Sequence, residues 1–512
     1  MIKNSLKYLK DSDFKSELNF LRAYTEIKKT DLFDGEFYTN AYPDVTGDAL
    51  AHYLYHGTSE CRYPSVNFDS SLYLEMYPDV EELGINPLIH YILYGIHENR
   101  IIKEVPVEAR KEEIARTNMA LLNNFKFEEE PLVSIIILNR NGLDHLKRLF
   151  KDFKEKTNYS NFEIIVVDNA SSDESVNYLK SLDLPVTVIE NRENVSFSKG
   201  NNDAVKMAKG DFVLLLNNDI EPTFGWLNEL VGTIMQSEKV AMVGAKLVFP
   251  FYFQDPEEKS YTIQHTGDIF AERMKPCCLY AVNKSNKDLD IFDPSLNKIT
   301  RSIAVTAAAT LIRKDIYTEV GGLDEDYIYG LEDVDFCLKL YKKGYLTAYC
   351  GTSLLFHHES STRVISKDYA RNDKHNFEVF INKWGKFLSG KMLLDKIDNK
   401  KFFSEKQLKI AIVGTSNEFT SRIAKEFNSR GYEISLHFNP EDNYFGDSTD
   451  ILLSFNPDFN LDDIIARRDI VKVFAGCEKV EGYDLQVENL SDNFTDEFLD
   501  KVREVIKHGF KG

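Results

Sequence analysis

The stretch VSIIILNRN at residues 133–141 is the first of four apolar runs that decide the fold of the central part of the chain. Each run has the length of a strand, and amphipathic stretches such as HLKRLFKDFKEK separate them. The runs are LVSIIILNRN (132–141), FEIIVVDNAS (162–171), LPVTVIENR (184–192) and DFVLLLNND (211–219). Strands that alternate with helices predict a parallel sheet with buried strands. We therefore expect an α/β domain that begins at Pro131.

Polar side chains follow all four runs, at the carboxyl ends of the predicted strands. A single polar strand end is commonly a helix cap or a turn. In open parallel sheets, however, ligands bind beyond the carboxyl ends of the strands, so four polar ends in succession predict a ligand site along one rim. These residues are Asn139, Arg140 and Asn141, then Asp168 and Asn169, then Glu190 and Asn191, and finally Asn217, Asn218 and Asp219.

The size and charge of the chain limit what the rest can be. A chain of 512 residues is too long for one hydrophobic core, so we expect about three domains. The 82 acidic and 62 basic residues give a net charge of -20, which argues against binding to nucleic acid or anionic lipid. A phosphate-bearing ligand must then be held locally, for which a divalent cation is one means. A surface that only keeps the protein in solution is the alternative for most of these carboxylates.

Cysteine usage and hydropathy indicate the compartment. The six cysteines include no CxxC pair, so neither a disulfide framework nor a structural zinc site is expected. The first residues lack an apolar signal core, and we find no window of roughly 18 or more apolar residues. We expect a cytoplasmic enzyme without a transmembrane segment, with peripheral association with the inner face of the membrane as a further option.

An internal repeat occupies the first hundred residues. The motif YPDV at 42–45 recurs at 77–80, and the His-Tyr pair at 52–53 recurs at 90–91. Each copy has an aromatic-rich helix, a proline turn, a second short helix and a glycine end. We predict a helical module at residues 1–102, with copies at about 32–66 and 67–102. Its histidines (52, 56, 90 and 97) could form a metal site, but aromatic spacing of this kind favours packing between the copies.

Three further segments complete the predicted organisation. Residues 103–130 are highly charged and predict a linker helix. The central domain extends from 131 to about 400, because the stretch at 367–392 predicts a helix that packs back onto it. Residues 407–512 begin with LKIAIVGTS and predict a smaller, Rossmann-like α/β domain. Since its first turn lacks GxGxxG, a docking or assembly role there is at least as plausible as a dinucleotide site.

A cluster of carboxylates, GLEDVD at 330–335, precedes the predicted helix FCLKLYKKG. The helix dipole favours anions at a helix start, and capping alone could explain one or two of these residues.

The ordered series of motifs resembles the family 2 glycosyltransferases of GT-A fold, particularly the bacterial rhamnosyltransferase-like branch. The resemblance covers residues 131 to 362, and the N-terminal repeat is similar to modules found beside bacterial glycan-assembly domains. The matching pieces are VSIIILNRNG, EIIVVDNASSD, ENRENVSFSKGNNDA, GDFVLLLNNDI, AVTAAATLIRKDIYTEVGGLDEDYIYGLEDVDFCLKL and LLFHHESSTR.

The resemblance implies a nucleotide site along the rim and a metal beside it. Asp168 would bind the base, and the fourth strand would end in a DxD-type motif, which here is Asn-Asn-Asp, so that only Asp219 offers a carboxylate to Mn²⁺ or Mg²⁺. The same resemblance makes a histidine after SLLF the second metal ligand. Its spacing to Ser360 and Thr362 favours His357 over His358. The other residues expected on the nucleotide and donor side are Leu138, Asn139, Arg140, Asn141, Asn169, Asn194, Asn201, Asn217 and Asn218.

The catalytic base implied by the resemblance is Asp333. A sugar hydroxyl is a poor nucleophile at neutral pH, so a carboxylate must take its proton during attack, and one displacement inverts the anomeric carbon. Glu332 would orient the acceptor, and Asp335 would fix the loop or a neighbouring lysine. The donor and acceptor cleft is expected to include His265, Gly267, Thr306, Ala307, Asp335 and His358, although tight strand packing would also explain the small residues of AVTAAAT.

The sequence thus predicts an inverting, metal-dependent hexosyltransferase that uses a nucleotide diphosphate sugar of the UDP-hexose or dTDP-rhamnose class. Its acceptor would be a glycan, a lipid-linked glycan or a glycoprotein, and the flanking domains could support an oligomer or complex. Two alternatives stay open. Asn217 in place of an aspartate favours a non-catalytic scaffold that only binds nucleotide sugar. A nucleotidyltransferase would also use a parallel sheet, but it usually has a glycine-rich basic signature that NRNGLDHLKRL lacks.

Overall fold

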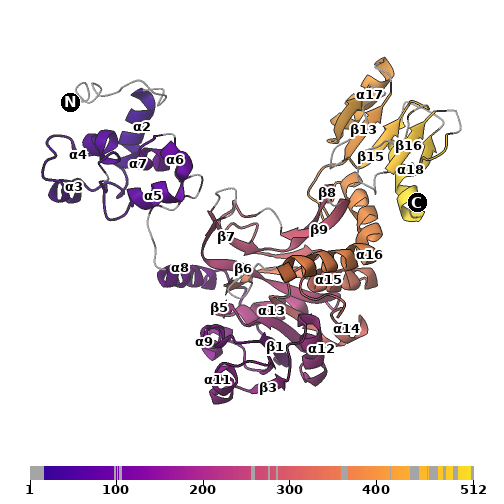
Figure 1. The fold of residues 1–512 in the computed structure, drawn as a ribbon, viewed down its shortest axis with the longest axis horizontal. Coiled ribbons are helices and arrows are strands. Elements are labelled where there is room, and N and C mark those ends of the chain that lie inside the picture. The colour runs from indigo at the N-terminus through magenta and orange to yellow at the C-terminus, as the bar shows by residue number, and fades with distance from the viewer. Residues whose placement is uncertain are drawn as a thin grey trace. The chain divides into compact units, whose positions relative to one another are not determined.

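A computed structural model gives the fold of the chain as two compact units (Figure 1). One unit comprises residues 1–117, 249–262 and 287–290, and the other comprises 118–248, 263–286 and 291–512. Ser360 and Thr362, His97, and the turn residues Thr415 and Ser416 lie outside the described residues. The structure describes residues 17–60, 62–82, 84–96, 98, 100, 102, 107–254, 260–274, 277–283, 286–358, 367–414, 417–438, 449–457, 459, 471–476, 480–487 and 494–508.

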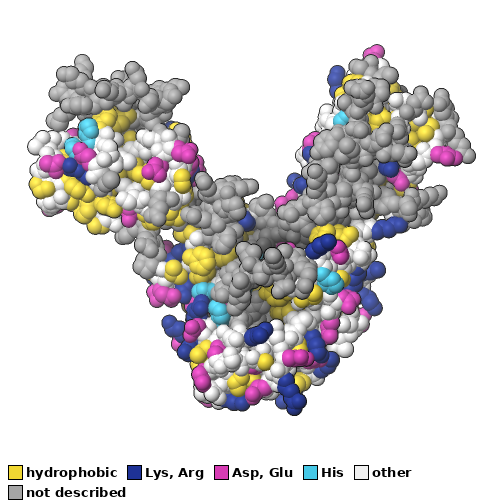
Figure 2. Space-filling view, viewed as in Figure 1, with side chains coloured by type: hydrophobic (Ala, Val, Ile, Leu, Met, Phe, Trp, Pro, Cys, Tyr) yellow, Lys and Arg dark blue, Asp and Glu magenta, His cyan; other side chains and the backbone are white. Residues whose placement is uncertain are grey.

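The first unit is mainly helical. Its helices are α2 (Glu17–Ile27), α3 (Gly35–Ala41), α4 (Ala49–His52), α5 (Ser70–Met76), α6 (Pro78–Glu82), α7 (Pro87–His90) and α8 (Val107–Met119, which ends in the second unit), with π-helical turns η2 (Tyr53–Gly57) and η3 (Tyr91–Gly95) continuing α4 and α7. Aspartates cap the first helix of each repeat copy, Asp34 for α3 and Asp69 for α5. Figure 2 shows hydrophobic side chains gathered on one face of this unit.

The two repeat copies make the same contacts. Tyr38 Oη lies 3.1 Å from His52 Nδ1, and Tyr73 Oη lies 2.9 Å from His90 Nδ1. These histidines thus contact buried tyrosines, as packing predicts, and within the described residues no group of three or more His, Cys, Asp or Glu could hold a metal ion. In each copy an arginine also pairs with the aspartate of Tyr-Pro-Asp and stacks on its tyrosine. The matched groups are Arg62, Asp44 and Tyr42, and Arg100, Asp79 and Tyr77.

The second unit contains most of a mixed sheet. Its strand order is β10-β12-β6-β11-β4-β1-β2-β3, with β5 paired to β12 and β7 paired to β6. The bounds are β1 (Val133–Asn139), β2 (Phe162–Asn169), β3 (Val186–Asn191), β4 (Phe212–Asn217), β5 (Ile220–Pro222), β6 (Val240–Gln254), β7 (Ser260–His265), β10 (Ile299–Ser302), β11 (Ala309–Arg313) and β12 (Leu346–His357). A separate hairpin pairs β8 (Asp268–Met274) with β9 (Cys277–Asn283).

The α/β class is confirmed, but a purely parallel sheet is wrong for this domain. The four apolar runs form β1 to β4, which are parallel neighbours in the order β4-β1-β2-β3. Beyond β4 the sheet is mixed, because β11 runs antiparallel to both β4 and β6 while β6 and β12 are parallel. The chain order reverses between β1 and β4, and this is where an open sheet has its ligand crevice.

Helices cover both faces of this sheet and create two cores. Alternate side chains of β1 enter opposite cores, Ile135 and Ile137 on one side and Ile136 on the other. One core is covered by α9 (Leu143–Leu149), α10 (Phe153–Thr157), α11 (Ser175–Ser181) and α13 (Trp226–Met235). The other is covered by α12 (Phe197–Met207), α14 (Lys314–Glu319), α15 (Glu332–Lys343) and α16 (Lys367–Ile397). The rim of the sheet is therefore the part that stays open for a ligand.

The C-terminal part of the second unit has a five-stranded parallel sheet, β14 (Glu433–His437), β13 (Lys409–Val413), β15 (Ile451–Ser454), β16 (Val471–Ala475) and β17 (Leu485–Val487), in that spatial order. This 2-1-3-4-5 order is the flavodoxin-like one and differs from the 3-2-1-4-5-6 order of Rossmann domains. Its core includes α17 (Glu418–Ser429), α18 (Phe494–His508) and the end of α16, where the buried Lys396 pairs with Asp450 at 2.7 Å. No helix among the described residues is long and apolar enough to cross a membrane.

Candidate functional site

A cavity of about 400 Å³ lies at the rim of the mixed sheet, inside the second unit. Its size is within the range of roughly 300–1,000 Å³ that ligand pockets have. The cavity is lined by Phe197 on α12, Asn217 at the end of β4, Leu247 on β6, Gln264 and His265 on β7, Asp268 on β8, residues 306–308 before β11, residues 329–334 at the start of α15, and His357 at the end of β12. Segments far apart in the sequence thus contribute to one space.

Asp333 enters this cavity from the first turn of α15. Gly330 and Leu331 both have left-handed backbone conformations, with φ of 101° and 71°, and this tight turn starts the helix at the cavity. Asp333 Oδ2 accepts a hydrogen bond from the Ala307 amide at 3.0 Å, and Oδ1 accepts one from Val334 at 2.8 Å. Burial raises the pKa of Asp333 although these amides oppose the shift. Asp333 is thus suited to take up a proton.

A second layer of contacts holds the loop that binds Asp333. The Thr306 amide donates to His265 Nε2 at 3.3 Å, and His265 Nδ1 lies 3.7 Å from Asp268 Oδ1. Gly267, with φ of 100°, lets the chain turn between them, and a Cβ there would approach Ser302 Oγ to 2.6 Å. His265 lines the cavity and is only 3% exposed, so it supports the loop from the cavity wall.

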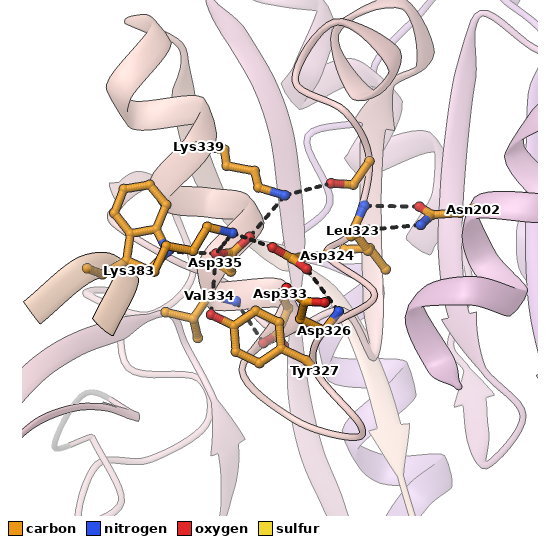
Figure 3. Close-up of polar contacts among 12 residues, drawn as sticks. Asn202, Leu323, Asp324, Asp326, Tyr327, Asp333, Val334, Asp335, Lys339 and Lys383 are labelled. Carbon is orange, nitrogen blue, oxygen red and sulfur yellow. Dashed lines mark hydrogen bonds and ion pairs between the residues drawn. The ribbon is translucent and has the colours of Figure 1, made fainter. Parts of the chain in front are cut away.

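The other carboxylates of the cluster differ from Asp333. Glu332 lines the cavity, and its Oε2 accepts a hydrogen bond from the Gly330 amide at 2.6 Å. Asp335 is fully buried and does not line the cavity, which differs from the expectation that it belongs to the cleft. It contacts Lys383 at 2.6 Å and Lys339 at 3.1 Å, and the Trp384 indole donates to it at 2.6 Å (Figure 3). Asp335 therefore fixes α15 to α16.

Asp219, which lies between β4 and β5, meets His357 at the end of β12. Asp219 Oδ1 lies 3.1 Å from His357 Nε2, while His357 Nδ1 lies 2.8 Å from Gln264 Oε1. Since a carbonyl oxygen only accepts, Nδ1 carries the ring proton and Nε2 of the neutral ring has a lone pair. Two acceptor atoms this close need a positive charge, either a proton on Nε2 or a cation bound by both. Burial alone would raise the pKa of Asp219, but His357 outweighs burial and the net shift is downward.

This pair fits a divalent cation. Two ligands at about 2.1 Å from an octahedral cation and at right angles to each other are roughly 3 Å apart, close to the observed separation. Mg²⁺ is commonly held by one or two carboxylates together with substrate phosphates and water, so two protein ligands are sufficient. The Gln264 contact also fixes the ring orientation, as partners of metal-binding histidines do.

His358 has other partners. Arg148 donates to His358 Nδ1 at 2.9 Å, and His358 Nε2 lies 3.4 Å from Glu221 Oε2. The His358 backbone amide donates to the Asp219 carbonyl at 3.1 Å, whereas the His357 ring contacts the Asp219 carboxylate. The geometry thus brings the ring of His357, and not that of His358, next to Asp219, the other candidate metal ligand.

Asparagine and aspartate side chains connect the ends of β1, β2 and β4. Asn218 donates to Asn139 Oδ1 at 2.9 Å, and Asn139 donates to Asp168 Oδ1 at 3.1 Å. Asp168 is 2% exposed and also accepts from the amide and hydroxyl of Ser171. A Cβ at Gly142 would lie within 2.5 Å of both the Asn139 and Asn218 side chains, so this bond needs glycine at 142. Asp168 therefore organises the loop after β2.

The remaining expected residues occupy the same rim without entering the cavity. Asn141 accepts from the Ser172 amide at 2.7 Å, and Asn169 accepts from Asn191 at 2.9 Å. Asn201 is buried and donates to the Phe197 carbonyl. Leu138 is partly buried, whereas Arg140 and Asn194 are exposed.

Several residues of the site were not singled out from the sequence. Gln264 lies in the stretch IQHTGD, but only the structure shows that it orients His357. Tyr329 and Leu331 line the cavity although they follow no strand, and Tyr329 is 45% exposed at its rim. The adjacent left-handed residues at 330 and 331 arise from a Gly-Leu pair that has no strong turn signal.

Residues 134–287 match the family described as "Glycosyl transferase family 2". This part of the chain is therefore similar to family 2 glycosyltransferases. Asp168, Asp219 and His265 lie inside the matched segment, and Asp333 and His357 lie beyond it.

Curated relatives share the same region. "Uncharacterized protein y4gI" of Sinorhizobium fredii (strain NBRC 101917 / NGR234) is 33% identical over 245 residues, which are 46% of this chain and 25% of that protein. "O-antigen biosynthesis protein RfbC" of Myxococcus xanthus is 29% identical over 237 residues, 46% of this chain and 18% of that protein. The chain thus spans a quarter or less of these two relatives. A solved structure of GalNAc-T7 with UDP, GalNAc and Mn²⁺ covers 64% of this chain and 63% of its own, with 16% identity and a TM-score of 0.40.

Proposed function

We propose that this chain is an inverting glycosyltransferase of GT-A fold that moves a hexose from a nucleotide diphosphate sugar to an acceptor hydroxyl. The observation that carries the proposal is the cavity, in which Asp333 and His357 line one space and Asp219 contacts His357 at 3.1 Å. A proton acceptor and a candidate cation site thus lie on one cavity, as transfer between a bound donor and an acceptor requires. The family 2 match to residues 134–287 supports the same reaction class.

Asp333 is the catalytic base of the proposed reaction. The acceptor oxygen attacks the anomeric carbon as its proton passes to Asp333, and the bond from that carbon to the diphosphate oxygen breaks. Attack opposite the leaving group inverts the configuration. The amides of Ala307 and Val334 hold the carboxylate in place, and the raised pKa of Asp333 makes it a stronger base than an exposed aspartate. Glu332 orients the acceptor from the same turn.

Asp219 and His357 would hold Mn²⁺ or Mg²⁺. A bound divalent cation supplies charge neutralisation for the departing diphosphate. Asn217 lines the cavity next to His357, and its amide contributes a neutral contact where a DxD motif would have a carboxylate.

The donor nucleotide is placed along the rim. Asp168 and Asn139 would hold its base side through the loop that they order with Ser171. Asn141, Asn169, Asn194, Asn201 and Asn218, with Leu138 and Arg140, form the remainder of this side. UDP-hexose and dTDP-rhamnose are both consistent with uncharged amide contacts.

The biological setting proposed is bacterial glycan assembly, with a polysaccharide, lipid-linked glycan or glycoprotein as acceptor. The relative from Myxococcus xanthus bears the name of an O-antigen biosynthesis protein, which supports this setting. The helical repeats at 1–102 and the α/β domain at 407–512 would then serve docking or assembly, and we place the reaction in the cytoplasm.

Release of nucleoside diphosphate tests the proposal. Sugar nucleotides would be incubated with and without Mn²⁺ and with and without simple glycoside acceptors. The proteins compared are the unsubstituted chain, Asp333→Asn and a control, Asp326→Asn. Asp326 is an exposed carboxylate seven residues away in the sequence. We expect the unsubstituted chain and the control to release nucleoside diphosphate. Asp333→Asn should release none above background. Donor binding without release in any sample would favour the scaffold, and pyrophosphate formed from a nucleoside triphosphate would favour a nucleotidyltransferase.

A further inference from the structure

A group of nitrogen-bearing side chains lies beside the candidate cation site. Arg148 on α9 donates to His358 Nδ1 at 2.9 Å, and its second terminal nitrogen lies 3.4 Å from His145 Nδ1. Asp219 connects this group to the cavity, because its carbonyl accepts from the His358 amide at 3.1 Å while its carboxylate contacts the His357 ring. The guanidinium of Arg148 is thus held near the place where a cation would bind.

The charge of Arg148 has no carboxylate directly beside it. Two imidazole nitrogens accept from its guanidinium, and among the residues that the structure describes it contacts no Asp or Glu. Glu221 lies 3.4 Å from the other nitrogen of the His358 ring, and Lys156 is 3.8 Å from Glu221. Other arginines contact carboxylates directly, namely Arg62, Arg100, Arg430 and Arg503. Because a guanidinium keeps its proton in proteins, Arg148 has a positive charge that an anionic ligand can neutralise.

Electrostatic effects also place this group close to the Asp219 carboxylate. Burial is the largest cause of the lowered pKa of His145, and the charge of Arg148 is the next. Asp219 opposes this lowering. The effect of one charge on another declines with distance, so His145 and its partner Arg148 lie near Asp219. A phosphate on a cation at Asp219 would therefore be close to the guanidinium.

The bound donor would need more positive charge than the cation site provides. Asp219 and the neutral His357 ring would leave about one unit of positive charge on a divalent cation, since only one of these two ligands is a carboxylate. The diphosphate of a sugar nucleotide is ionised at both phosphorus atoms, and further negative charge develops on it as the sugar leaves. A guanidinium suits the remaining place, because its fork of N–H donors matches phosphate oxygens.

We propose that Arg148 binds the diphosphate of the donor, beside the cation that Asp219 and His357 would hold, and that His145 and His358 orient its guanidinium. The proposal rests on the proposed function, because it assumes a nucleotide diphosphate sugar as the donor. Arg148 is partly buried, so water and salt screen its charge less than that of an exposed arginine. Its two ring partners hold the guanidinium before the donor binds, which reduces the entropy lost on binding.

Nucleotides that differ only in the number of phosphates test the proposal. Calorimetry in the presence of Mn²⁺ and again in EDTA gives Kd for UDP, dTDP and GDP and for their monophosphates. The proteins compared are the unsubstituted chain, Arg148→Gln and Arg148→Lys. We expect Arg148→Gln to weaken diphosphate binding roughly 10–100-fold and monophosphate binding by less, so that the preference for the diphosphate falls. Arg148→Lys should recover part of the preference, because it keeps the charge and loses only the fork of donors.

Lys147→Gln is the matched control. Lys147 is the neighbouring residue on α9 and its side chain is 54% exposed, so the substitution removes the same charge from the same helix and should leave the preference unchanged. Equal weakening of diphosphate and monophosphate by Arg148→Gln would mean that Arg148 only joins α9 to the end of β12. That result, or unchanged diphosphate binding, overturns the proposal while the transferase stands. If none of these nucleotides binds the unsubstituted chain, the proposed function fails as well.

Discussion

Helix α15 has two acidic faces with different surroundings. Asp333 faces the cavity and accepts hydrogen bonds from backbone amides, while Asp335, two residues later, faces α16 and contacts two lysines and the Trp384 indole. Both carboxylates lie in the first turn, where the helix dipole favours an anion. The difference shows that the surroundings, and not the helix start that they share, decide which carboxylate is open to the cavity and which one joins two helices.

The physical reason is the type of partner. The neutral amides offset only part of the free-energy cost of burying the Asp333 carboxylate. Its pKa is therefore raised, and it can exchange a proton. Asp335 is neutralised by ammonium groups that come from its own helix and from α16 (Figure 3). A residue that holds two helices together in this way is a poor candidate for proton transfer.

The substitution Asp333→Asn should give the largest effect on the cavity face. General bases contribute roughly 10²–10⁴-fold to rate, so we expect turnover to fall by about that factor. Donor binding should be retained, because asparagine has the same shape and only the proton acceptor is lost. Nucleoside diphosphate release and donor calorimetry on one sample measure both. Normal turnover in this variant would break the comparison, since Asp333 would then differ from Asp335 only in its neighbours.

On the other face, Asp335→Asn should reduce stability. Removing one partner of a fully buried ion pair costs roughly 3–5 kcal/mol. Because Lys383 and Lys339 keep 32% and 19% of their side chains exposed, we expect a smaller loss, about 2–3 kcal/mol. Denaturant unfolding followed by tryptophan fluorescence measures it. Asp324→Asn is the control, because Asp324 also pairs with Lys383 but is 21% exposed. An equal loss from both variants would mean that burial of Asp335 contributes nothing.

Much of the fold could be predicted from the sequence, because buried parallel strands form continuous apolar runs, and β1 to β4 coincide with the four runs. The mixed half of the sheet could not. Strand β12 changes register between Cys350 and Leu354, and a Cβ at Gly351 would lie 1.9 Å from the Leu296 carbonyl. A glycine required by such a long-range contact has no local signal.

Only part of the candidate site could be predicted from the sequence. The polar strand ends are visible in the sequence, because each follows an apolar run. The partners of Asp335 could not be found from the sequence, since Lys383 and Trp384 come from another helix far along the chain. The same holds for Gln264, whose contact with His357 joins residues 93 positions apart. Spacing in sequence does not report contacts that tertiary packing creates.

Gln264→Leu should weaken metal binding and so test the cation side of the cavity. Loss of a partner that orients a metal-binding histidine typically costs 10–100-fold in affinity, and we expect a decrease in that range for Mn²⁺. Paramagnetic resonance of free Mn²⁺ in the presence of nucleoside diphosphate measures it without turnover. Gln236→Leu changes an exposed glutamine after α13 and should have no effect. Unchanged affinity in Gln264→Leu would argue against His357 as a ligand.

The pH dependence of stability should also test the cavity face of α15, where Asp333 lies. The folded-state pKa of Asp333 is raised above 3.8, so its neutral form is favoured and its ionised form costs stability. Below the unfolded pKa, Asp333→Asn and the parent chain should be equally stable. As pH rises through the folded pKa, the parent should fall behind by about 1.4 kcal/mol for each unit between the two pKa values. This difference is measured by comparing the unfolding free energies of the parent and the variant from about pH 3 to about pH 8. A variant that is less stable than the parent at neutral pH would contradict the sign.

Tyr329→Ala should have the smallest effect and acts at the outer edge of the cavity face. Its ring lines the cavity and is 45% exposed, and the loop is fixed because Asn376 accepts from the Ile328 amide and donates to the Tyr329 carbonyl. A rigid aromatic wall stabilises a stacked partner by about 0.5–1.5 kcal/mol. We therefore expect the KM for acceptor to rise roughly 2–12-fold with kcat unchanged.

Ile328→Ala is the matched control for this last prediction, because Ile328 has the same 45% exposure and does not line the cavity. Tyr329→Phe should behave as the parent if the ring face is what matters. If Tyr329→Ala lowered kcat and left the acceptor KM unchanged, the ring would act on the turn that carries Asp333 and not on the acceptor. Residue 329 would then act together with the cavity face of α15, because the turn and the base would form one structural element.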